Sequence, residues 1–366
     1  MRQVSLMSVL AVILPRLHSR ELIRDRRKAR KLKMSHSYRP VRWTAAHFVR
    51  VGLCLGISAP LILAGAGFSQ LANTKITHQN DPPNHLPVFQ ADAFLRLKAN
   101  LTGSPTIEAL DLQGNMLGSA SVLIPDAHVT GVNAFSRGAD GTIVAGGWCE
   151  SADGKIASFI DVIASGGGAP QIIRTNPYGV EKLVVATDGT IWTVGNVLHR
   201  ASDPPDSDPK GGTVRHFDRS GKLLESFFPY TALDDRLRVM MGTLDASRDR
   251  VGWISTGDPQ PGKGRMGAYV EFTSAGVQEY PLPAIAPTAG AVLYGLALTD
   301  NGGIFVKVLT GGQRTEFMSL DRSTGSWTAV SPFIDPGNDA MLFGASGNTV
   351  AVWTPSTMNV YFYQTK

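Results

Sequence analysis

The clearest hydrophobic pattern in the chain lies between residues 184 and 196, where two short apolar runs flank Asp188 and Gly189. Asp-Gly between apolar runs is typical of a β-hairpin, because a type I′ turn needs positive φ at its central residues and glycine adopts it without a Cβ clash. Residues 191–194 are β-branched or aromatic, which favours a strand. Both faces of this strand are apolar, so we expect neighbouring elements to cover both.

The same turn pattern recurs along the chain, each time before a new apolar run. Its five copies are Asp140-Gly141, Asp188-Gly189, Asp249-Arg250, Asn301-Gly302 and Gly347-Asn348. Successive copies are 46 to 61 residues apart. A near-regular period of this length indicates a repeat architecture.

A second hairpin follows the first in most periods. Its turns are Gln113-Gly114, Arg219-Ser220-Gly221, Ala275-Gly276 and Thr324-Gly325. Two hairpins supply four strands, which is the unit of a propeller blade. The sequence therefore predicts an all-β protein, a β-propeller of six four-stranded blades, with five or seven blades as alternatives.

The two ends of the repeat region are complementary. The last period has a first hairpin over residues 340–354 and a third strand over 359–363. The segment 94–124 has later strands but lacks a clear Asp-Gly hairpin before them. We therefore expect N-terminal strands to complete or adjoin the last blade and close the ring, which removes open sheet edges.

Two strings carry a resemblance to known families. Residues 188–195 (DGTIWTVG) and 217–224 (FDRSGKLL) resemble repeats of the NHL, streptogramin-lyase-like and TolB-like propeller groups. The resemblance covers about 94–366 and concerns the fold, which does not by itself give a function. Streptogramin lyases would imply a catalytic histidine in the late blades. No histidine follows His216, so that activity is not expected.

Charge divides the chain. Residues 1–66 contain 13 Lys and Arg against 2 Asp and Glu, whereas the remaining residues have a net charge of −6. The repeat region therefore lacks the basic surface that nucleic-acid binding requires. Cys149 is the only cysteine outside the N-terminal region, which excludes an intramolecular disulfide there.

The N-terminal region predicts export. An 18-residue apolar run over residues 51–68 follows Arg50, and Ala64-Gly65-Ala66 provides small residues for cleavage. Residues 34–68 are thus an export signal or an N-terminal membrane anchor, which places the rest in the periplasm or outside the cell. Residues 1–33 are interpreted as an upstream extension before the more ordinary start at Met34. Membrane contact is expected only through residues 51–68, if they remain uncleaved.

The polar, proline-containing segment 69–92 is predicted to be a linker without structure of its own, followed by the propeller at 93–366. Trp192, Trp253 and Phe305 each lie four residues beyond a turn. This shared register predicts packing between blades.

Six-bladed lactonase-type hydrolases resemble this architecture and hold a divalent cation over the channel with Glu, Asn and Asp side chains. Candidate oxygen donors on the loop face are Glu150, Asn176, Glu181, Asn196, Asp235 and Asp339. Calcium would suit such ligands and would polarise an ester carbonyl. The alternative is that these residues are solvated loop polar groups.

No nucleophile elbow and no Cys/His metal cluster occur in the sequence. The glycine-rich string at 262–267 precedes a strand instead of a helix, so it does not indicate a phosphate site. No cofactor is therefore identified, with calcium as the candidate ion. The sequence favours an exported, non-enzymatic domain that binds a protein or small molecule on its loop face. The alternative is a calcium-dependent lactonase- or gluconolactonase-like hydrolase acting at the central channel.

Overall fold

The computed structural model describes the β-structured part of the chain. The described residues are 68–75, 87–98, 104–197, 212–228, 243–255, 259–260, 263–264, 268–282, 293–309, 315–330, 340–354, 357 and 359–365. Residues 1–67, with the predicted start extension and nearly all of the predicted export segment, lie outside this set. No helix within the described ranges is long and apolar enough to cross a membrane.

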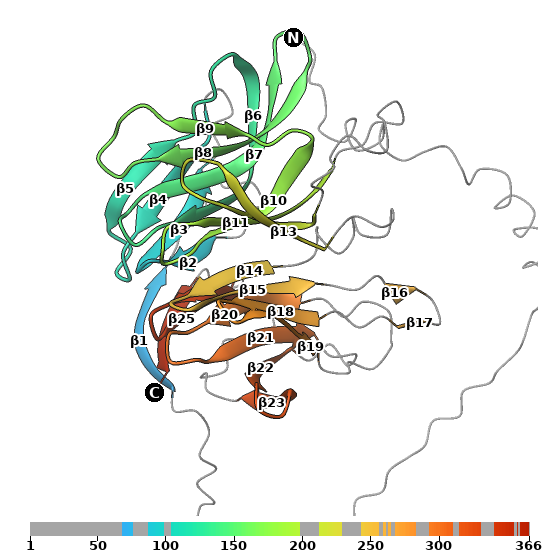
Figure 1. Cartoon of the computed structure of the whole chain (residues 1–366). Helices are drawn as coiled ribbons and strands as arrows, with labels where there is room; N and C mark the ends of the chain where they lie inside the picture. Colours follow the sequence, from blue (N-terminus) through green and yellow to red (C-terminus); the bar gives the residue numbers. More distant parts are fainter. Residues whose placement is uncertain are drawn as a thin grey trace, which may run out of the picture. The chain divides into compact units, whose positions relative to one another are not determined.

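The strands form six four-stranded antiparallel sheets, numbered here as blades 1 to 6 in chain order (Figure 1). Blade 1 contains β2 (Val88–Gln90), β3 (Ala93–Lys98), β4 (Thr106–Leu110) and β5 (Met116–Ser121). Blade 2 contains β6 (Ala127–Arg137), β7 (Ile143–Ser151), β8 (Ile156–Ile163) and β9 (Gln171–Arg174). Blade 3 contains β10 (Tyr178–Val185), β11 (Ile191–Val197), β12 (Val214–Phe217) and β13 (Leu223–Phe227).

The second half of the chain repeats this arrangement. Blade 4 contains β14 (Thr243–Ser247), β15 (Arg250–Ser255), β18 (Ala268–Thr273) and β19 (Gly276–Pro281). Blade 5 contains β20 (Leu293–Leu298), β21 (Ile304–Leu309), β22 (Thr315–Asp321) and β23 (Ser326–Val330). Blade 6 contains β24 (Met341–Ser346), β25 (Thr349–Thr354), β26 (Asn359–Thr365) and β1 (Phe68–Lys75). A separate two-stranded sheet consists of β16 (Pro259–Gln260) and β17 (Lys263–Gly264).

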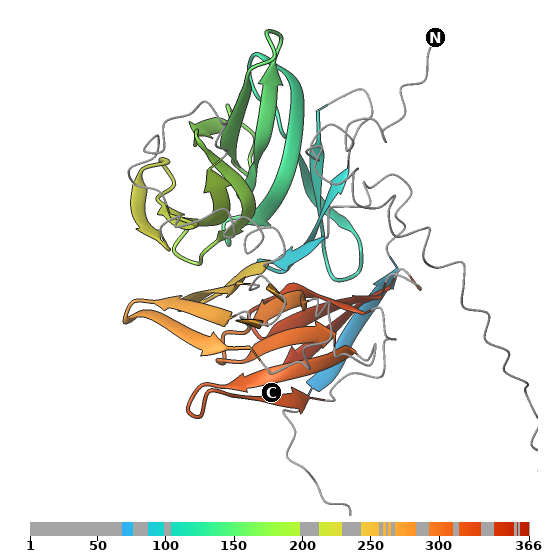
Figure 2. The same cartoon turned by 90° about the vertical axis from the view of Figure 1, so that its right-hand side faces the viewer.

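The first strands of the blades close a ring. β2 contacts β6, β6 contacts β10, β10 contacts β14, β14 contacts β20, β20 contacts β24, and β24 returns to β2. The predicted six-bladed, all-β propeller is confirmed. The predicted completion of the last blade by the N-terminal part of the chain is also confirmed, because β1 pairs antiparallel with β26 from Phe68↔Thr365 to Lys75↔Asn359. Figure 2 shows β1 in blue beside the red C-terminal strands.

The segment that supplies this strand was predicted wrongly. Residues 69–92 were expected to be an unstructured linker, yet they contain most of β1 and all of β2, so the propeller begins at Phe68 and not at residue 93. β1 is the outermost strand of its blade, and the side chains of Gln70 and Leu71 are exposed. Phe68 packs edge-to-face on Phe305 at 5.3 Å, and Ala72 joins a hydrophobic cluster.

Blade 1 also has the first hairpin that its sequence seemed to lack. β2 and β3 are joined by Ala91 and Asp92, whose φ angles are +46° and +56°. Both values are unusual for residues with a Cβ atom. Ser346 of blade 6 stabilises the turn, because the Asp92 N–H donates to Ser346 Oγ at 2.9 Å and that hydroxyl donates to Asp92 Oδ1 at 2.8 Å.

The hairpins lie at the predicted Asp-Gly positions, but their turns are not of the predicted type I′. At Asp188-Gly189 only the glycine has positive φ, +83°. The Gly189 N–H donates to Ala186 O, and the Ala186 N–H donates to Thr190 O, both at 2.9 Å. These bonds define a three-residue loop, a type I turn followed by a left-handed glycine, instead of a type I′ turn. Residues 138–142 repeat the same bonds.

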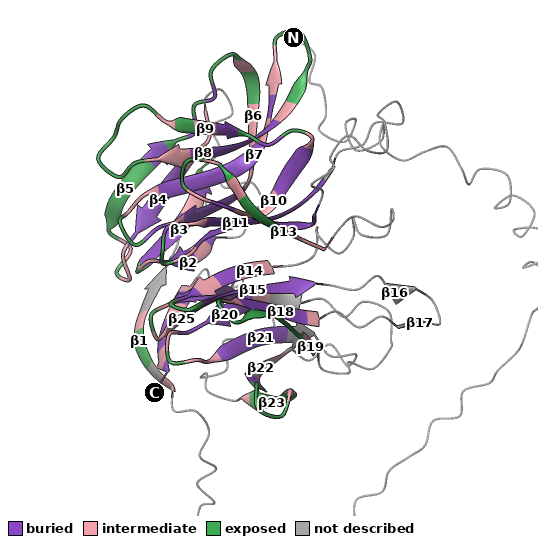
Figure 3. Ribbon diagram, viewed as in Figure 1, coloured by how far each residue is buried: buried purple, intermediate pink, exposed green. Residues whose placement is uncertain are grey.

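Hydrophobic packing occupies the junctions between blades. The six clusters of buried side chains correspond one to each junction within the described part of the ring. Trp192, Trp253 and Phe305 are 8%, 2% and 3% exposed and lie in clusters between blades, which confirms their predicted packing there. Trp192 and Trp253 meet at the same junction from its two sides, so the shared register does not give them a shared direction. In Figure 3 the middle strands are mostly buried, whereas the outermost strand β5 is largely exposed.

One buried carboxylate interrupts this apolar packing. Asp161 in β8 is 0% exposed, and neither of its oxygens has a hydrogen-bond partner in the described structure. Its cross-strand neighbours are Ala145 and Ile172. Burial raises the pKa of Asp161 to about 7. Because an unfolded aspartate titrates near 4, the folded chain binds this proton more tightly. The associated stability is present below about pH 4 and is lost as pH rises through about 7.

We therefore expect Asp161→Val to raise the free energy of unfolding most at alkaline pH, on the order of 4 kcal/mol more at pH 8 than at pH 4. Thermal unfolding of both proteins between pH 4 and pH 8 measures the difference. The isosteric Asp161→Asn should remove the same pH dependence of stability. Asp153→Asn is the control, since its side chain is 52% exposed, and it should leave that pH dependence in place. A difference between wild type and Asp161→Val that stays constant with pH would contradict this account.

Candidate functional site

Four of the six predicted oxygen donors lie in the described structure. Glu150 and Asn196 lie near the ends of β7 and β11, Asn176 precedes β10, and Glu181 lies within β10. Glu150, Asn176 and Asn196 lie on the side of blades 2 and 3 that is opposite to the Asp-Gly turns. Asp235 and Asp339 lie outside the described residues.

The contacts of these four donors are separate from one another. Asn176 Oδ1 accepts a hydrogen bond from the Ser158 N–H at 2.8 Å, which is a structural role. Asn196 is 7% exposed and its Oδ1 has no partner within the described residues. Glu181 lies at a β-bulge, where burial raises its pKa and Lys182 partly lowers it. No three His, Cys, Asp or Glu side chains among the described residues are close enough to hold a metal ion. The calcium site therefore stays a prediction.

The inner strands are joined by a polar network that the sequence did not reveal. The Val185 N–H donates to Ser136 Oγ at 2.8 Å, and this hydroxyl donates to Gln90 Oε1. Gln90 Nε2 in turn donates to Asp245 Oδ1 at 3.5 Å. These residues come from blades 3, 2, 1 and 4. A chain of hydrogen bonds thus runs between side chains that are far apart in sequence.

Asp245 extends the network to the remaining blades. Its Oδ2 accepts from the Leu298 N–H of blade 5 at 2.8 Å, and the Ala345 N–H of blade 6 also donates to the carboxyl group. Burial raises the pKa of Asp245 to about 8, against the hydrogen bonds from Leu298, Ala246, Gln90 and Ala345, which lower it. Because every blade contributes, we call this set the inner-ring network and assign it to stability.

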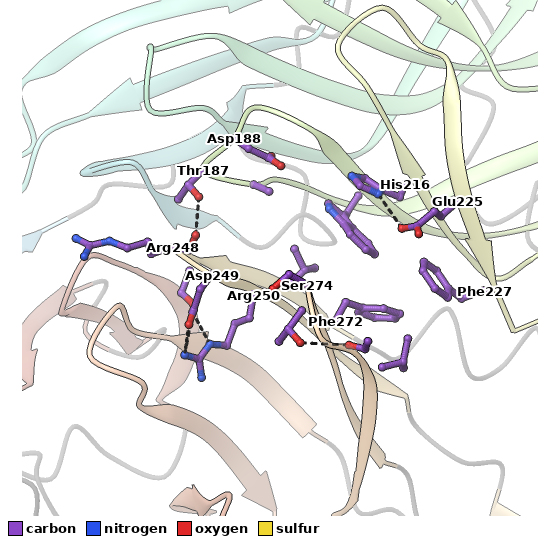
Figure 4. Close-up of a pocket in the computed structure, with 17 residues that line it drawn as sticks. Thr187, Asp188, His216, Glu225, Phe227, Arg248, Asp249, Arg250, Phe272 and Ser274 are labelled. Carbon is purple, nitrogen blue, oxygen red and sulfur yellow. Dashed lines mark hydrogen bonds and ion pairs between the residues drawn. The ribbon is translucent and has the colours of Figure 1, made fainter.

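A cavity of about 440 Å³ lies between blades 3 and 4, on the side of the first-hairpin turns (Figure 4). Thr187 and Asp188 of one turn face Arg248 and Asp249 of the next at its mouth. Thr187 Oγ1 donates to Arg248 O at 2.8 Å, so a direct bond joins the two turns.

One wall of the cavity is aromatic. Trp192, His216 and Glu225 are direct cross-strand neighbours on β11, β12 and β13. The His216 ring stacks on Trp192 with centroids 4.1 Å apart and an interplanar angle of 16°. Phe227 stacks parallel to Trp192 at 5.9 Å, and Phe272 of blade 4 meets Trp192 at 5.0 Å. Flat aromatic surfaces from two blades therefore border the same space.

Polar groups complete the lining. His216 Nδ1 lies 3.3 Å from Glu225 Oε2. The Arg250 guanidinium donates to both carboxylate oxygens of Asp249, at 2.9 and 3.1 Å, and lies 3.5 Å from Glu271 Oε2. Its charge is therefore neutralised within the protein.

Three buried polar atoms of residues lining this cavity have no hydrogen-bond partner in the described structure: Ser247 Oγ, His216 Nε2 and Arg250 Nη1. Arg250 Nη1 still forms an ion pair with Glu271 Oε2 at 3.5 Å. Ser247 is only 5% exposed. Buried polar groups in proteins are almost always hydrogen-bonded, so these atoms have hydrogen-bonding capacity that a ligand or a water molecule would satisfy.

Sequence reasoning placed the ligand on the other face and did not identify this cavity. It assigned Trp192 to the core, which is correct, but did not pair it with His216 or Glu225. The hairpin with its turn at residues 219–221 offered the register that brings these side chains into one row. The contribution of Phe272 from the next blade had no counterpart in the sequence pattern.

No protein-family model and no curated protein matches the chain. Among solved structures, it is similar to the PQQ-bound aldose sugar dehydrogenase of Streptomyces coelicolor, with 14% identity, a TM-score of 0.45, and coverage of 82% of this chain and 99% of that chain. TolB from Acinetobacter baumannii is 12% identical, with a TM-score of 0.41 and coverage of 75% and 63%. The RRP9 WD40 repeats are 10% identical, with a TM-score of 0.42 and coverage of 82% and 98%. These similarities concern the propeller fold alone.

Proposed function

We propose that the chain is an exported, non-enzymatic binding propeller and that the cavity between blades 3 and 4 receives its ligand, a small molecule or a side chain of a protein partner. The observation that carries the proposal is the aromatic wall together with the unpaired Ser247 Oγ and His216 Nε2. Pockets that are mostly apolar, with a few convergent polar groups, are typical of ligand sites. The apolar run at residues 51–68 supports export, which N-terminal sequencing of the mature protein would test.

Binding fits this site better than hydrolysis. A serine nucleophile needs a hydrogen bond to its general base. Ser247 and His216 are the available pair here, but no such bond joins them, because Ser247 Oγ and His216 Nε2 both lack any partner among the described residues. One face of the His216 imidazole is also covered by Trp192, which stacks on it at 4.1 Å. The site therefore has surfaces for recognition without an activated nucleophile.

The proposal predicts that small aromatic compounds bind the purified domain at a single site. Ligand-observed NMR with a set of cationic, neutral and anionic aromatic fragments should find at least one class with a Kd on the order of 1 mM or tighter. Phe227→Ala should weaken that binding about tenfold, because it removes part of a wall that is only partly buried and spares Trp192.

Leu224→Ala is the matched control, since Leu224 is 43% exposed on the same strand and does not line the cavity. Absence of binding by all three fragment classes would contradict the proposal. Calcium-dependent turnover of a lactone set by the wild-type domain would also overturn it and favour the hydrolase alternative.

A further inference from the structure

We infer that the cavity between blades 3 and 4 recognises a planar cationic group, an amidinium or guanidinium carried on an apolar body. This inference rests on the proposed function and specifies the ligand of the same site. It depends on three features of the lining: the charges left unneutralised at the mouth, the flat aromatic wall, and the acceptor atoms beside that wall.

The charges at the cavity favour a cation. Asp188, Glu225 and Asp249 line it against Arg248 and Arg250. Both arginines pair with carboxylates of the chain, Arg250 in a buried position and Arg248 with a side chain that is 77% exposed. Arg250 is bound by Asp249 and Glu271, and the Arg248 guanidinium lies 3.7 Å from Asp300 Oδ2.

The directions of the side chains add to the excess of negative over positive charge near His216. In Figure 4 the Arg248 side chain extends away from His216, whereas Glu225 lies beside it. Glu225 is 58% exposed, so its carboxylate is accessible to a ligand. A cleft with an excess of carboxylates concentrates cations and repels anions.

The aromatic wall suits a flat cation at Phe227, its partly exposed ring, whereas Trp192 is 8% exposed and stacked on His216. Trp192 and Phe227 are parallel within 11°, and Phe272 is tilted by 44° against Trp192. A cation over an aromatic face gains about 0.5–2 kcal/mol, and a planar guanidinium or amidinium also stacks. A compact ammonium group would use the charge but not the flat surface.

The polar atoms beside the aromatic wall accept hydrogen bonds, apart from Arg250 Nη1, a buried donor that lies 3.5 Å from Glu271 Oε2. The Glu225 carboxylate is an acceptor only, and a neutral His216 that donates from Nδ1 to Glu225 has an acceptor at Nε2. The Ser247 hydroxyl, which has no partner in the described structure, accepts as well. Amidinium and guanidinium groups present several N–H donors in one plane, which complements such a set.

Benzamidine is the first probe, and its uncharged and anionic analogues are benzamide and benzoate. By isothermal titration calorimetry on the full chain in low salt, benzamidine should bind at least tenfold more tightly than benzamide, and benzoate should show no binding. Glu225→Gln should weaken benzamidine about three- to tenfold and leave benzamide unchanged, because it removes charge and keeps shape. Glu150→Gln, the same substitution on blade 2 outside the cavity, should have no effect.

A second pair of probes distinguishes the two sources of this chemistry. A capped Gly-Arg-Gly peptide that binds more tightly than benzamidine, with its citrulline analogue inactive, would identify an arginine side chain of a protein partner. Tighter binding of benzamidine than of the peptide would identify a free small molecule. Both outcomes support the cationic ligand.

Equal binding of benzamidine and benzamide, tighter binding of benzoate, or an unchanged benzamidine affinity in Glu225→Gln would overturn the inference. If benzamide or benzoate binds and Phe227→Ala weakens it, the binding function stands and only the charge preference fails. If no fragment binds, both fail.

Discussion

Deletion of β1 is expected to lower the melting temperature of the propeller by about 10 °C or more. The deletion removes a strand that pairs with β26 along its length and detaches Phe68 from Phe305. The lost hydrogen bonds and apolar contacts amount to about 5 kcal/mol, and each kcal/mol shifts the melting temperature of a domain this large by roughly 2 °C. Circular dichroism or calorimetry of a chain starting at residue 76 measures the effect.

The matched control is a chain that starts at Phe68 and keeps the strand. Its melting temperature should equal that of the full chain, since the described contacts of blade 6 remain. Without β1, β26 becomes an exposed edge, so self-association should rise with concentration. A peptide of residues 68–75 should restore part of the stability by adding the missing strand. Equal melting temperatures of the two truncated chains would show that the ring does not depend on β1.

The second large effect is expected at Asp245. Asp245→Ala should lower the free energy of unfolding by about 3–5 kcal/mol, because it leaves the buried Leu298 N–H and Gln90 Nε2 without their acceptor. The loss extends beyond blade 4, since the same carboxyl group is bonded by donors of blades 1, 5 and 6. Chemical denaturation of wild type and variant at pH 4, where the raised pKa of Asp245 costs wild type little stability, measures it.

The pH dependence of folding stability provides a second test of the role of Asp245. The pKa of Asp245 is raised to about 8 in the folded state, above that of an unfolded aspartate near 4. The corresponding stability is present below about pH 4 and is lost as pH rises through about 8. Asp245→Asn is neutral throughout, so its stability relative to wild type should improve between pH 6 and pH 9. A loss below 1 kcal/mol in Asp245→Ala, or a parallel pH profile in Asp245→Asn, would exclude the proposed role of the network.

Ring closure thus has two components. β1 completes the outer part of blade 6, and the inner-ring network joins all six inner strands at the centre. The cavity between blades 3 and 4 includes no residue of β1 or of the inner-ring network, since turns and side chains of these two blades line it. Binding and ring stability can therefore be tested by separate substitutions.

The sequence by itself determined the features that depend on neighbouring residues. Asp188-Gly189 and its copies marked the hairpins, because a glycine with positive φ and an aspartate that accepts from the N–H two residues on act within five residues. The spacing of these turns, with a second hairpin in most periods, predicted the blade count, and the apolar residues four positions beyond the turns predicted packing between blades.

Only the tertiary structure decided the rest. β1 is a polar strand whose partner lies at the other end of the chain, and the Ala91–Asp92 turn contains no glycine and is held by Ser346. The inner-ring network and the cavity likewise join side chains from different blades. Such contacts arise when separate strands meet in a particular register, and pairing across hundreds of residues leaves no local pattern of hydrophobic and polar positions.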